Sequence, residues 1–112
     1  MLVYKIFRDS EWQALRDKGS SNGAAIDLTD GYMHLSTGEQ SAETAAKHFA
    51  GQADLMLLAI DADAMGSALK WEPSRGGALF PHLYRALQLG EVLWAKPLPL
   101  VDGSHVFPDD QA

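Results

Sequence analysis

The sequence predicts a small single α+β domain, in which two or three short helices pack against about five short strands. Three observations favour this class. Leu55–Ile60 is a continuous apolar run. Capping-box patterns at Ser10–Gln13 and Thr37–Gln40 each open a helical segment. Tyr32–Ser36 alternates polar and apolar side chains, as a half-buried strand does.

The N-terminal third is predicted to contain a strand, a helix and a loop. Leu2–Phe7 is an apolar-rich segment typical of a strand. The capping box at Ser10 predicts a helix that runs to about Lys18, and Gly19 is expected to end it in a left-handed conformation. Residues 20–30 are small and polar, so we expect a loop there, partly ordered against the body of the domain.

The next segments predict a strand, a helix and a second strand. In the strand at 32–36, the period of two places Tyr32, His34 and Ser36 on one face. The helix that follows carries an apolar stripe, which we expect to face the core, made of Ala42, Ala45, Ala46 and Phe49. The apolar run at 55–60 is long enough for a central strand covered on both faces, packed against this stripe.

The C-terminal half is predicted to hold two further strands separated by a turn. Residues 68–72 alternate and form one strand. Phe80–Leu87 carries Pro81 at a plausible first helical position, so we expect a short turn or helix. Residues 91–98 form the last strand, with Val92 and Trp94 on one face, and its prolines indicate the edge of a sheet.

Composition limits the classes of function. The net charge is −6, from 9 basic and 15 acidic residues, which argues against broad nucleic-acid binding. The absence of cysteine excludes disulfides, thiolate chemistry and zinc–cysteine sites. No apolar run is long enough to span a membrane, and the N-terminus does not resemble a signal peptide, so we expect a cytoplasmic protein. We expect one domain over residues 1–101 and a mobile tail over 102–112.

His34 is the first candidate site residue. Histidine is the main side chain that titrates near neutral pH, and His34 shares a strand face with Tyr32 and Ser36. The cap at Thr37 follows directly, and a strand–turn–helix junction can offer N–H groups to an anion. The alternative is a half-buried structural histidine bonded to the backbone.

His82 is the second candidate. It follows Pro81, and Tyr84 is a possible stacking or hydrogen-bonding partner. The alternative is that its neighbours pack the core while His82 caps a turn.

Trp71 and Glu72 offer an aromatic platform beside a carboxylate, and Glu72 is the best general-base candidate among the carboxylates. The alternative for this pair is a core tryptophan beside a solvated carboxylate.

No metal site is predicted. The chain lacks HxH and HExxH spacings, a phosphate-binding loop and a nucleophile elbow. A metal held by His34 and His82 is the weakest alternative, because two ligands alone rarely hold a metal ion.

The chain resembles the DUF952 family over about residues 1–98. The segments that carry the resemblance are Glu11-Trp12, Asp30-Gly31-Tyr32-Met33-His34-Leu35-Ser36-Thr37 with Gln40, Leu57 to Asp61, Leu69 to Glu72, and Leu79 to Tyr84. The family in turn resembles the ADP-ribosyltransferase fold, especially the branch with RNA 2′-phosphotransferase. That resemblance implies a split antiparallel β-structure with a central cleft for NAD or an ADP-ribose-like moiety.

The resemblance also implies roles for individual residues. His34 matches the histidine that contacts a ribose or phosphate region, and His82 or Tyr84 would fill the second signature position. The third position, acidic in classical transferases, falls near Glu91–Leu93.

We therefore hypothesise a nucleotide-binding, transferase-like domain. His34 would hydrogen-bond a ribose hydroxyl or phosphate, Tyr32 or Tyr84 would stack on a ring, and His82 would orient the scissile bond or accept a proton. The ligand-binding candidates are Tyr32, Ser36, Thr37, Trp71 and Tyr84. The alternative is a non-catalytic domain that keeps the cleft and binds a small ligand, and a carboxylate in the cleft would separate the two.

Overall fold

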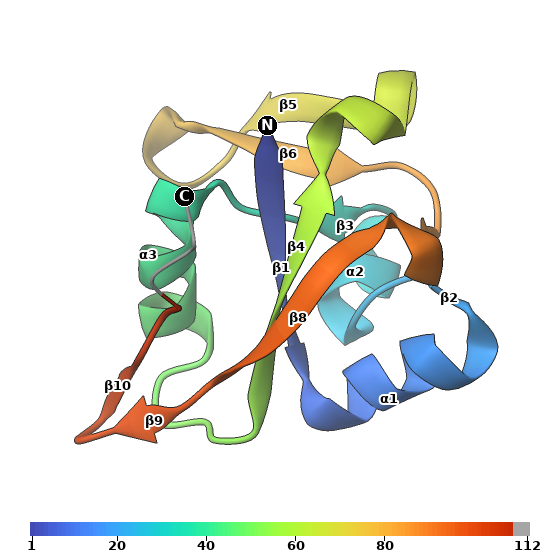
Figure 1. Cartoon of the computed structure of the whole chain (residues 1–112). Helices are drawn as coiled ribbons and strands as arrows, with labels where there is room; N and C mark the ends of the chain where they lie inside the picture. Colours follow the sequence, from blue (N-terminus) through green and yellow to red (C-terminus); the bar gives the residue numbers. More distant parts are fainter. Residues whose placement is uncertain (109–112) are drawn as a thin grey trace.

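A three-stranded antiparallel sheet forms the centre of the computed structural model, which describes residues 1–108 (Figure 1). Its order is β1-β4-β8, from β1 (Leu2–Arg8), β4 (Leu55–Asp61) and β8 (Val92–Leu98). The apolar run of β4 is therefore the central strand, as predicted. β8 lies at the edge, where the missing N–H of Pro97 costs the sheet least.

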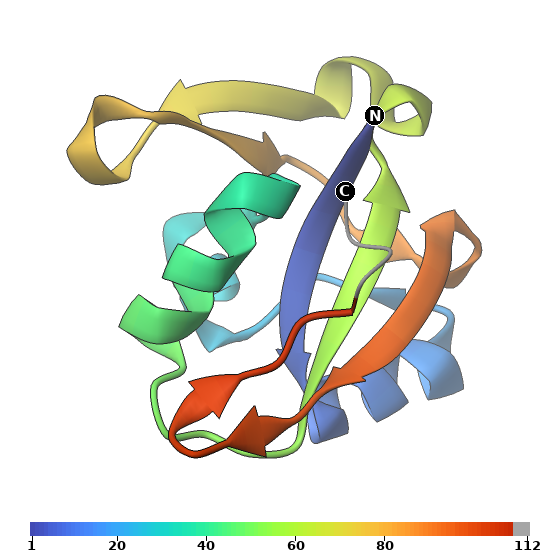
Figure 2. The same cartoon turned by 60° about the vertical axis from the view of Figure 1, so that its left-hand side comes forward.

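A second antiparallel sheet lies across one end of the first (Figure 2). Its order is β3-β6-β5, from β3 (Met33–His34), β6 (Leu79–Leu83) and β5 (Leu69–Pro73). A bridge between Tyr4 and Ser36 joins the two sheets through two backbone hydrogen bonds. The smaller elements are β2 (Ser20–Ser21) paired with β7 (Leu87–Gln88), β9 (Leu100–Val101) paired with β10 (Ser104–His105), and 3-10 turns at Ala62–Ala68, Arg75–Gly77 and Leu89–Glu91.

The first helix, α1 (Asp9–Lys18), is present as predicted but its cap differs. Arg8 is the N-cap residue, and Glu11 Oε1 accepts the Arg8 backbone N–H at 2.7 Å. The predicted box at Ser10 is wrong because β1 leads directly into the helix, which places the acidic residue at the third helical position. Gly19 ends the helix at φ 81°, which confirms the left-handed cap.

Residues 20–30 are not simply a loop. They contain β2 and the short helix α2 (Ala25–Asp30), which ends at Gly31 with φ 83°. The sequence did not predict α2, because this segment of small and polar residues has no apolar stripe. The helix is held instead by one buried carboxylate, that of Asp27. Ile26 and Leu28 are exposed on this helix.

The third helix, α3 (Gly38–His48), begins with the predicted capping box. Thr37 Oγ1 accepts the Gln40 N–H at 3.2 Å, and Gln40 Oε1 accepts the Thr37 N–H at 3.0 Å. The predicted stripe is half wrong, because Ala42 and Ala46 are exposed. The helix instead buries Ser41 and Ala45, and the Ser41 hydroxyl donates to the Thr37 carbonyl, so a polar side chain is tolerated inside.

The segment with Pro81 is a strand, β6, and the predicted turn or helix is wrong. The Pro81 carbonyl accepts the Leu35 N–H at 3.0 Å, just beyond the end of the short strand β3. Proline has no N–H to donate, but β3 has already ended opposite Pro81, so few hydrogen bonds between β3 and β6 are lost. The local preference of the Phe80–Leu87 segment therefore gives way to pairing with β5.

Val92 and Trp94 do not share a face. The register between β4 and β8 shifts at Ala59 and Ile60, so that Ile60 pairs with Val92 and Ala59 pairs with Trp94. The intervening Leu93 is the extra residue of a bulge. Val92 packs on one core cluster and Trp94 on the other, which corrects the prediction from simple alternation.

The central sheet is covered on both faces. Leu58 belongs to the cluster under α1, with Phe7 and Leu15, whereas Leu57 belongs to the cluster under α3, with Ala45. Alternate side chains of β4 thus fill two cores, which explains its continuous apolar sequence. The α+β class is confirmed. No helix within residues 1–108 is long and apolar enough to cross a membrane.

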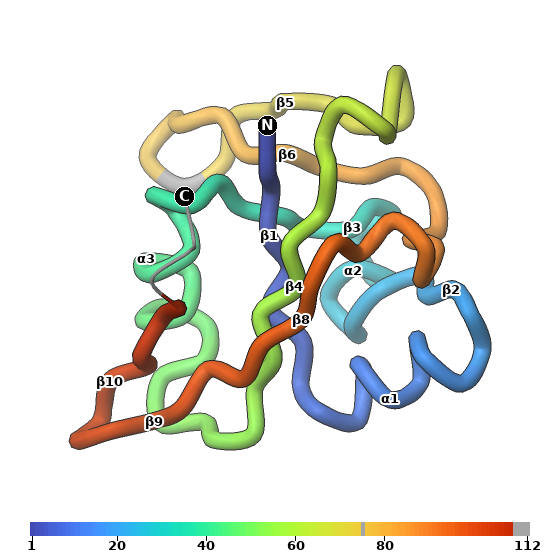
Figure 3. Tube along the Cα trace, in the orientation of Figure 1, coloured from blue at the N-terminus to red at the C-terminus, as the bar shows by residue number. Residues whose placement is uncertain are grey.

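The predicted domain end at residue 101 falls inside the β9–β10 hairpin (Figure 3). His105 pairs with Leu100, its Nε2 contacts the Gln52 carbonyl at 2.8 Å, and Phe107 packs on the α3-side core. Residues 109–112 of the predicted tail lie outside the described residues.

Candidate functional site

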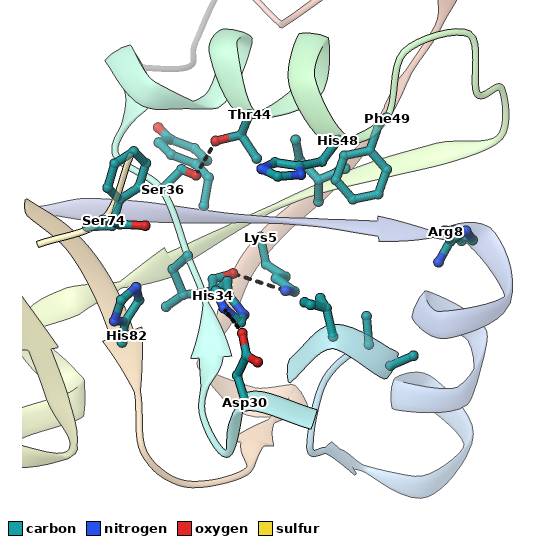
Figure 4. Close-up of a pocket in the computed structure, with 17 residues that line it drawn as sticks. Lys5, Arg8, Asp30, His34, Ser36, Thr44, His48, Phe49, Ser74 and His82 are labelled. Atoms are coloured by element: carbon teal, nitrogen blue, oxygen red, sulfur yellow. Dashed lines mark hydrogen bonds and ion pairs between the residues drawn. The ribbon is translucent and has the colours of Figure 1, made fainter. Parts of the chain in front are cut away.

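The structure brings His34 and His82 together. They are register partners on β3 and β6, and their ring centroids lie 5.6 Å apart. Both line a cleft of about 550 Å³ between β1, α2 and α3 (Figure 4). A volume of this size is typical of small-molecule sites.

Tyr32 packs against both imidazoles. Its ring centroid lies 4.7 Å from that of His34 and 4.3 Å from that of His82, and Tyr84 is 5.2 Å away. Burial, with Asp30 and Glu72 nearby, raises the pKa of Tyr32, so its hydroxyl stays protonated at neutral pH. Two imidazoles and two phenols thus form one polar aromatic cluster.

Two carboxylates of α2 hold the His34 ring. Asp27 Oδ1 lies 2.6 Å from Nδ1 and also accepts the His34 backbone N–H at 2.9 Å. Asp30 Oδ2 lies 2.9 Å from Nε2. The left-handed turn at Gly31 returns the chain from α2 into β3, which explains why residues four and seven positions earlier reach the same ring.

A buried ion pair lies behind this contact. Lys5 Nζ is 2.7 Å from Asp27 Oδ2, and the two residues are 5% and 1% exposed. Burial raises the pKa of Asp27, but the hydrogen bond from His34 and the charge of Lys5 outweigh it and hold the pKa at about 2. Burial lowers the pKa of Lys5, and the neighbouring Asp27 opposes that shift.

Glu72 holds the His82 ring. Glu72 Oε1 lies 2.9 Å from His82 Nδ1 and accepts the Tyr84 hydroxyl at 2.6 Å. The hydrogen bonds from Tyr84 and His82 lower the pKa of Glu72, and the bond to Glu72 raises the pKa of Tyr84 to about 12. His82 is buried, so its orientation is set by this contact and by packing against Tyr32.

Among the other predicted site residues, Ser36 and Thr37 form hydrogen bonds within the protein, whereas Trp71 lies away from the cleft. Ser36 lines the cleft, but it is buried and its hydroxyl is bonded to Thr44 at 3.0 Å. The Thr37 hydroxyl and backbone N–H both form hydrogen bonds with Gln40 in the α3 cap, so neither group is open to the anion contact that was predicted. Trp71 is exposed on β5, and the described residues that line the cleft do not include Trp71, Tyr32 or Tyr84.

Sequence reasoning missed Lys5, Asp27, Asp30 and Arg8. One signal was available for Lys5, since a lysine inside the apolar strand 2–7 must find a partner if it is buried. Asp27 had no such signal, because it lies among small polar residues. The described residues contain no group of three or more side chains suited to a metal ion.

The cleft has two chemically different ends. His82 lies at one end and Arg8 at the other, with Lys5 and His34 between them (Figure 4). The histidine end carries Asp30 and, behind His82, Glu72. Among the described residues, the contact of the Arg8 guanidinium is a long one of 3.5 Å to Glu11, and half of the Arg8 side chain is exposed.

The family model described as "Protein of unknown function (DUF952)" matches residues 6–95. The chain belongs to the DUF952 family. The matched range includes His34, His82, Asp27 and Glu72, whereas Lys5 lies just before it. A comparison with curated proteins finds no match.

This DUF952 domain is similar to protein CC0527 from Caulobacter crescentus, a structural genomics target. In its crystal structure, CC0527 is 53% identical in sequence to this chain. The alignment covers 95% of this chain and 94% of CC0527, and the two structures superpose with a TM-score of 0.91. The solution NMR structure of the same protein is also 53% identical, with a TM-score of 0.83 and coverage of 93% and 90%. These likenesses establish the fold.

Proposed function

We propose that this DUF952 domain is an enzyme that binds a nucleotide, NAD or ADP-ribose, in the His34–His82 cleft. The observation that carries the proposal is the contact of 2.9 Å between His82 Nδ1 and Glu72 Oε1. Glu72 has a lowered pKa and is ionised at neutral pH, so it can only accept. The hydrogen of a neutral His82 ring therefore lies on Nδ1, and Nε2 is left as a proton acceptor, the arrangement of a general base.

The charges around the two histidines favour chemistry at a ribose over chemistry at a phosphate. Asp30 and Glu72 place negative charge near the rings, and Lys5 is already paired with Asp27. An anionic phosphate is disfavoured in such surroundings, whereas the positive charge that develops on an anomeric carbon is stabilised. The phosphates of the ligand would lie toward Arg8.

The reaction supported by this arrangement is cleavage of the N-glycosidic bond of NAD. As the bond breaks, nicotinamide leaves with the bonding electron pair and the ribose carbon becomes cation-like. A hydroxyl group or water then forms the new bond to that carbon, and His82 Nε2 takes its proton. Tyr32, which packs against both imidazoles, would hold the two rings in place.

The second candidate is a domain that binds the nucleotide without turnover. Two observations favour it: both ring nitrogens of His34 already contact carboxylates, and Glu72 approaches the cleft through His82 rather than directly. This alternative shares the ligand and differs in the absence of product.

The test has two parts, binding and turnover. ¹⁵N-labelled protein is titrated with NAD, ADP-ribose and a 2′-phosphorylated nucleotide, and we expect resonances of β3, β6 and α2 to shift. Nicotinamide release from NAD is then measured for wild type, His82→Gln and Glu72→Gln, with the exposed Leu93→Ala as control. Binding with no nicotinamide released would leave the non-catalytic candidate, and no binding at millimolar nucleotide would remove both.

A further inference from the structure

We propose that Asp27, held in place by Lys5, is a positioning residue that fixes the ring of His34 with Nδ1 inward and Nε2 toward the cleft, beside Asp30. The identity of that ligand rests on the proposed function. The role of Asp27 does not, because it concerns a ring that can be observed in the free protein.

The contacts of Asp27 are directed at His34. Its Oδ1 accepts two hydrogen bonds from that residue, one from the ring and one from the backbone. Its Oδ2 accepts the Ala24 N–H at 2.7 Å and pairs with Lys5 at 2.7 Å. Lys5 in turn donates to the His34 carbonyl at 3.0 Å. The pair thus holds the backbone of His34 on both sides and its ring at Nδ1.

A buried ion pair of this kind is a poor device for stability alone. Removing two charges from water costs several kcal/mol, and apolar side chains of similar volume often serve as well or better. Lys5 lies within the apolar-rich segment 2–7 of β1, where a methionine would fill similar space. A role in orienting His34 accounts for the presence of two buried charges beside the cleft.

The arrangement decides which ring nitrogen carries the hydrogen. Asp27 is ionised and can only accept, so the Nδ1 atom that touches it must bear a hydrogen. Asp30 makes the same demand on Nε2, but Asp30 lies on the exposed rim and Asp27 is buried. When the ring is neutral, its hydrogen stays on Nδ1 and bonds to Asp27, and the hydrogen bond between Nε2 and Asp30 is lost. Nε2 can then accept a hydrogen bond from a hydroxyl group of the ligand. His82 follows the same rule, with Glu72 in the place of Asp27.

The decisive experiment is nitrogen-15 NMR of the histidine rings in the ligand-free protein, at a pH where the ring shifts report the neutral form. Free histidine then prefers the hydrogen on Nε2. We expect His34 to carry it on Nδ1 instead. A neutral His34 ring with its hydrogen on Nε2 in the wild type would overturn the proposal without any variant.

The matched variants separate orientation from folding. Lys5→Met/Asp27→Leu replaces the ion pair by apolar side chains, and we expect His34 to revert to the Nε2–H form while thermal unfolding stays cooperative. Asp30→Asn is the control and should leave Nδ1–H in place. If His34 changes to the Nε2–H form in Asp30→Asn but not in the double variant, Asp30 sets the position of the ring hydrogen and the proposal is overturned.

The affinity for ADP-ribose gives the functional readout. We expect Lys5→Met/Asp27→Leu and His34→Ala each to weaken binding about tenfold, and the two changes together to weaken it no further. Fully additive losses would show that the pair supports binding by a route other than His34. If the wild type binds no nucleotide, the proposed function fails while the ring spectra still decide the role of Asp27.

Discussion

His34 and His82 lie opposite each other on neighbouring antiparallel strands, with ring centroids 5.6 Å apart. Each ring contacts a carboxylate through Nδ1, Asp27 at 2.6 Å and Glu72 at 2.9 Å. The two carboxylates come from different elements, α2 and β5, on different sides of the pair. The site is therefore assembled by tertiary structure, and the consequences can be tested residue by residue.

The phenol of Tyr84 should ionise unusually late. Its hydrogen bond to Glu72 raises its pKa to about 12, because ionisation would place two negative charges together. The difference in ultraviolet phenolate absorbance between wild type and Tyr84→Phe should therefore have a midpoint near pH 12. Since the folded pKa is raised, the contribution of this bond to stability is present below the ordinary tyrosine pKa and is lost as the pH rises through about 12.

Glu72→Gln serves as the control for this titration. It removes the negative charge and keeps an oxygen acceptor, so the Tyr84 midpoint should fall toward the ordinary value of about 10. An unchanged midpoint in Glu72→Gln would mean that the contact with Glu72 is not the cause.

Acid should weaken the fold through Asp27. Its pKa of about 2 in the folded protein lies below the ordinary 3.8, so Asp27 stabilises the fold above that ordinary value. The contribution is about 2 kcal/mol near neutral pH and is lost as the pH falls from about 5 to below 2. Urea unfolding across this pH range measures it.

The comparison for this prediction is Lys5→Met/Asp27→Leu, which lacks the carboxylate. Its free energy of unfolding should depend less steeply on pH in the acid range, while the other carboxylates contribute equally to both proteins. Parallel curves for the two proteins would show that the acid sensitivity arises elsewhere.

The sequence predicts the elements that depend on local signals. The Thr37 cap needs only the side chains of Thr37 and Gln40, which are three residues apart. The apolar run of β4 follows directly from burial on two faces. These features, and the placement of His34 on a strand end beside the cleft, can be read along the chain. The predicted strand at 32–36 is shorter in the structure, where β3 covers Met33–His34 and Ser36 forms an isolated bridge with Tyr4.

The remaining features depend on contacts between distant segments. Pro81 lies in a strand because β3 ends beside it, and Val92 and Trp94 are separated by a bulge whose partner is β4. Asp27 is buried by Lys5 and His34, which lie far from each other in the sequence. Neither hydrophobic periodicity nor local propensity contains this information, so the contacts of Asp27 could not be predicted.

The central strand should be the most sensitive part of the core. Leu57 and Leu58 are both fully buried, on opposite faces of β4. Leu57→Ala and Leu58→Ala should each lower the free energy of unfolding by ~2–5 kcal/mol, from lost transfer energy and the cavity left behind. Leu93→Ala, at a position 56% exposed, should stay within about 0.5 kcal/mol. Losses at Leu57 or Leu58 as small as the control would contradict the burial of β4 on that face.

Arg8 should determine affinity for the anionic part of the ligand. It lines the cleft at the end away from His82, half exposed, with a long contact to Glu11. Arg8→Met keeps the aliphatic stem and removes the charge, so it should weaken ADP-ribose binding by ~1–3 kcal/mol, the scale of a hydrogen bond to a charged group. Calorimetry should show no such loss for adenosine, which carries no phosphate. Arg16→Met, in the last turn of α1, is the matched control for removing one positive charge. Equal losses in the two variants would indicate a general effect of net charge, and equal losses for ADP-ribose and adenosine would place the phosphates away from Arg8.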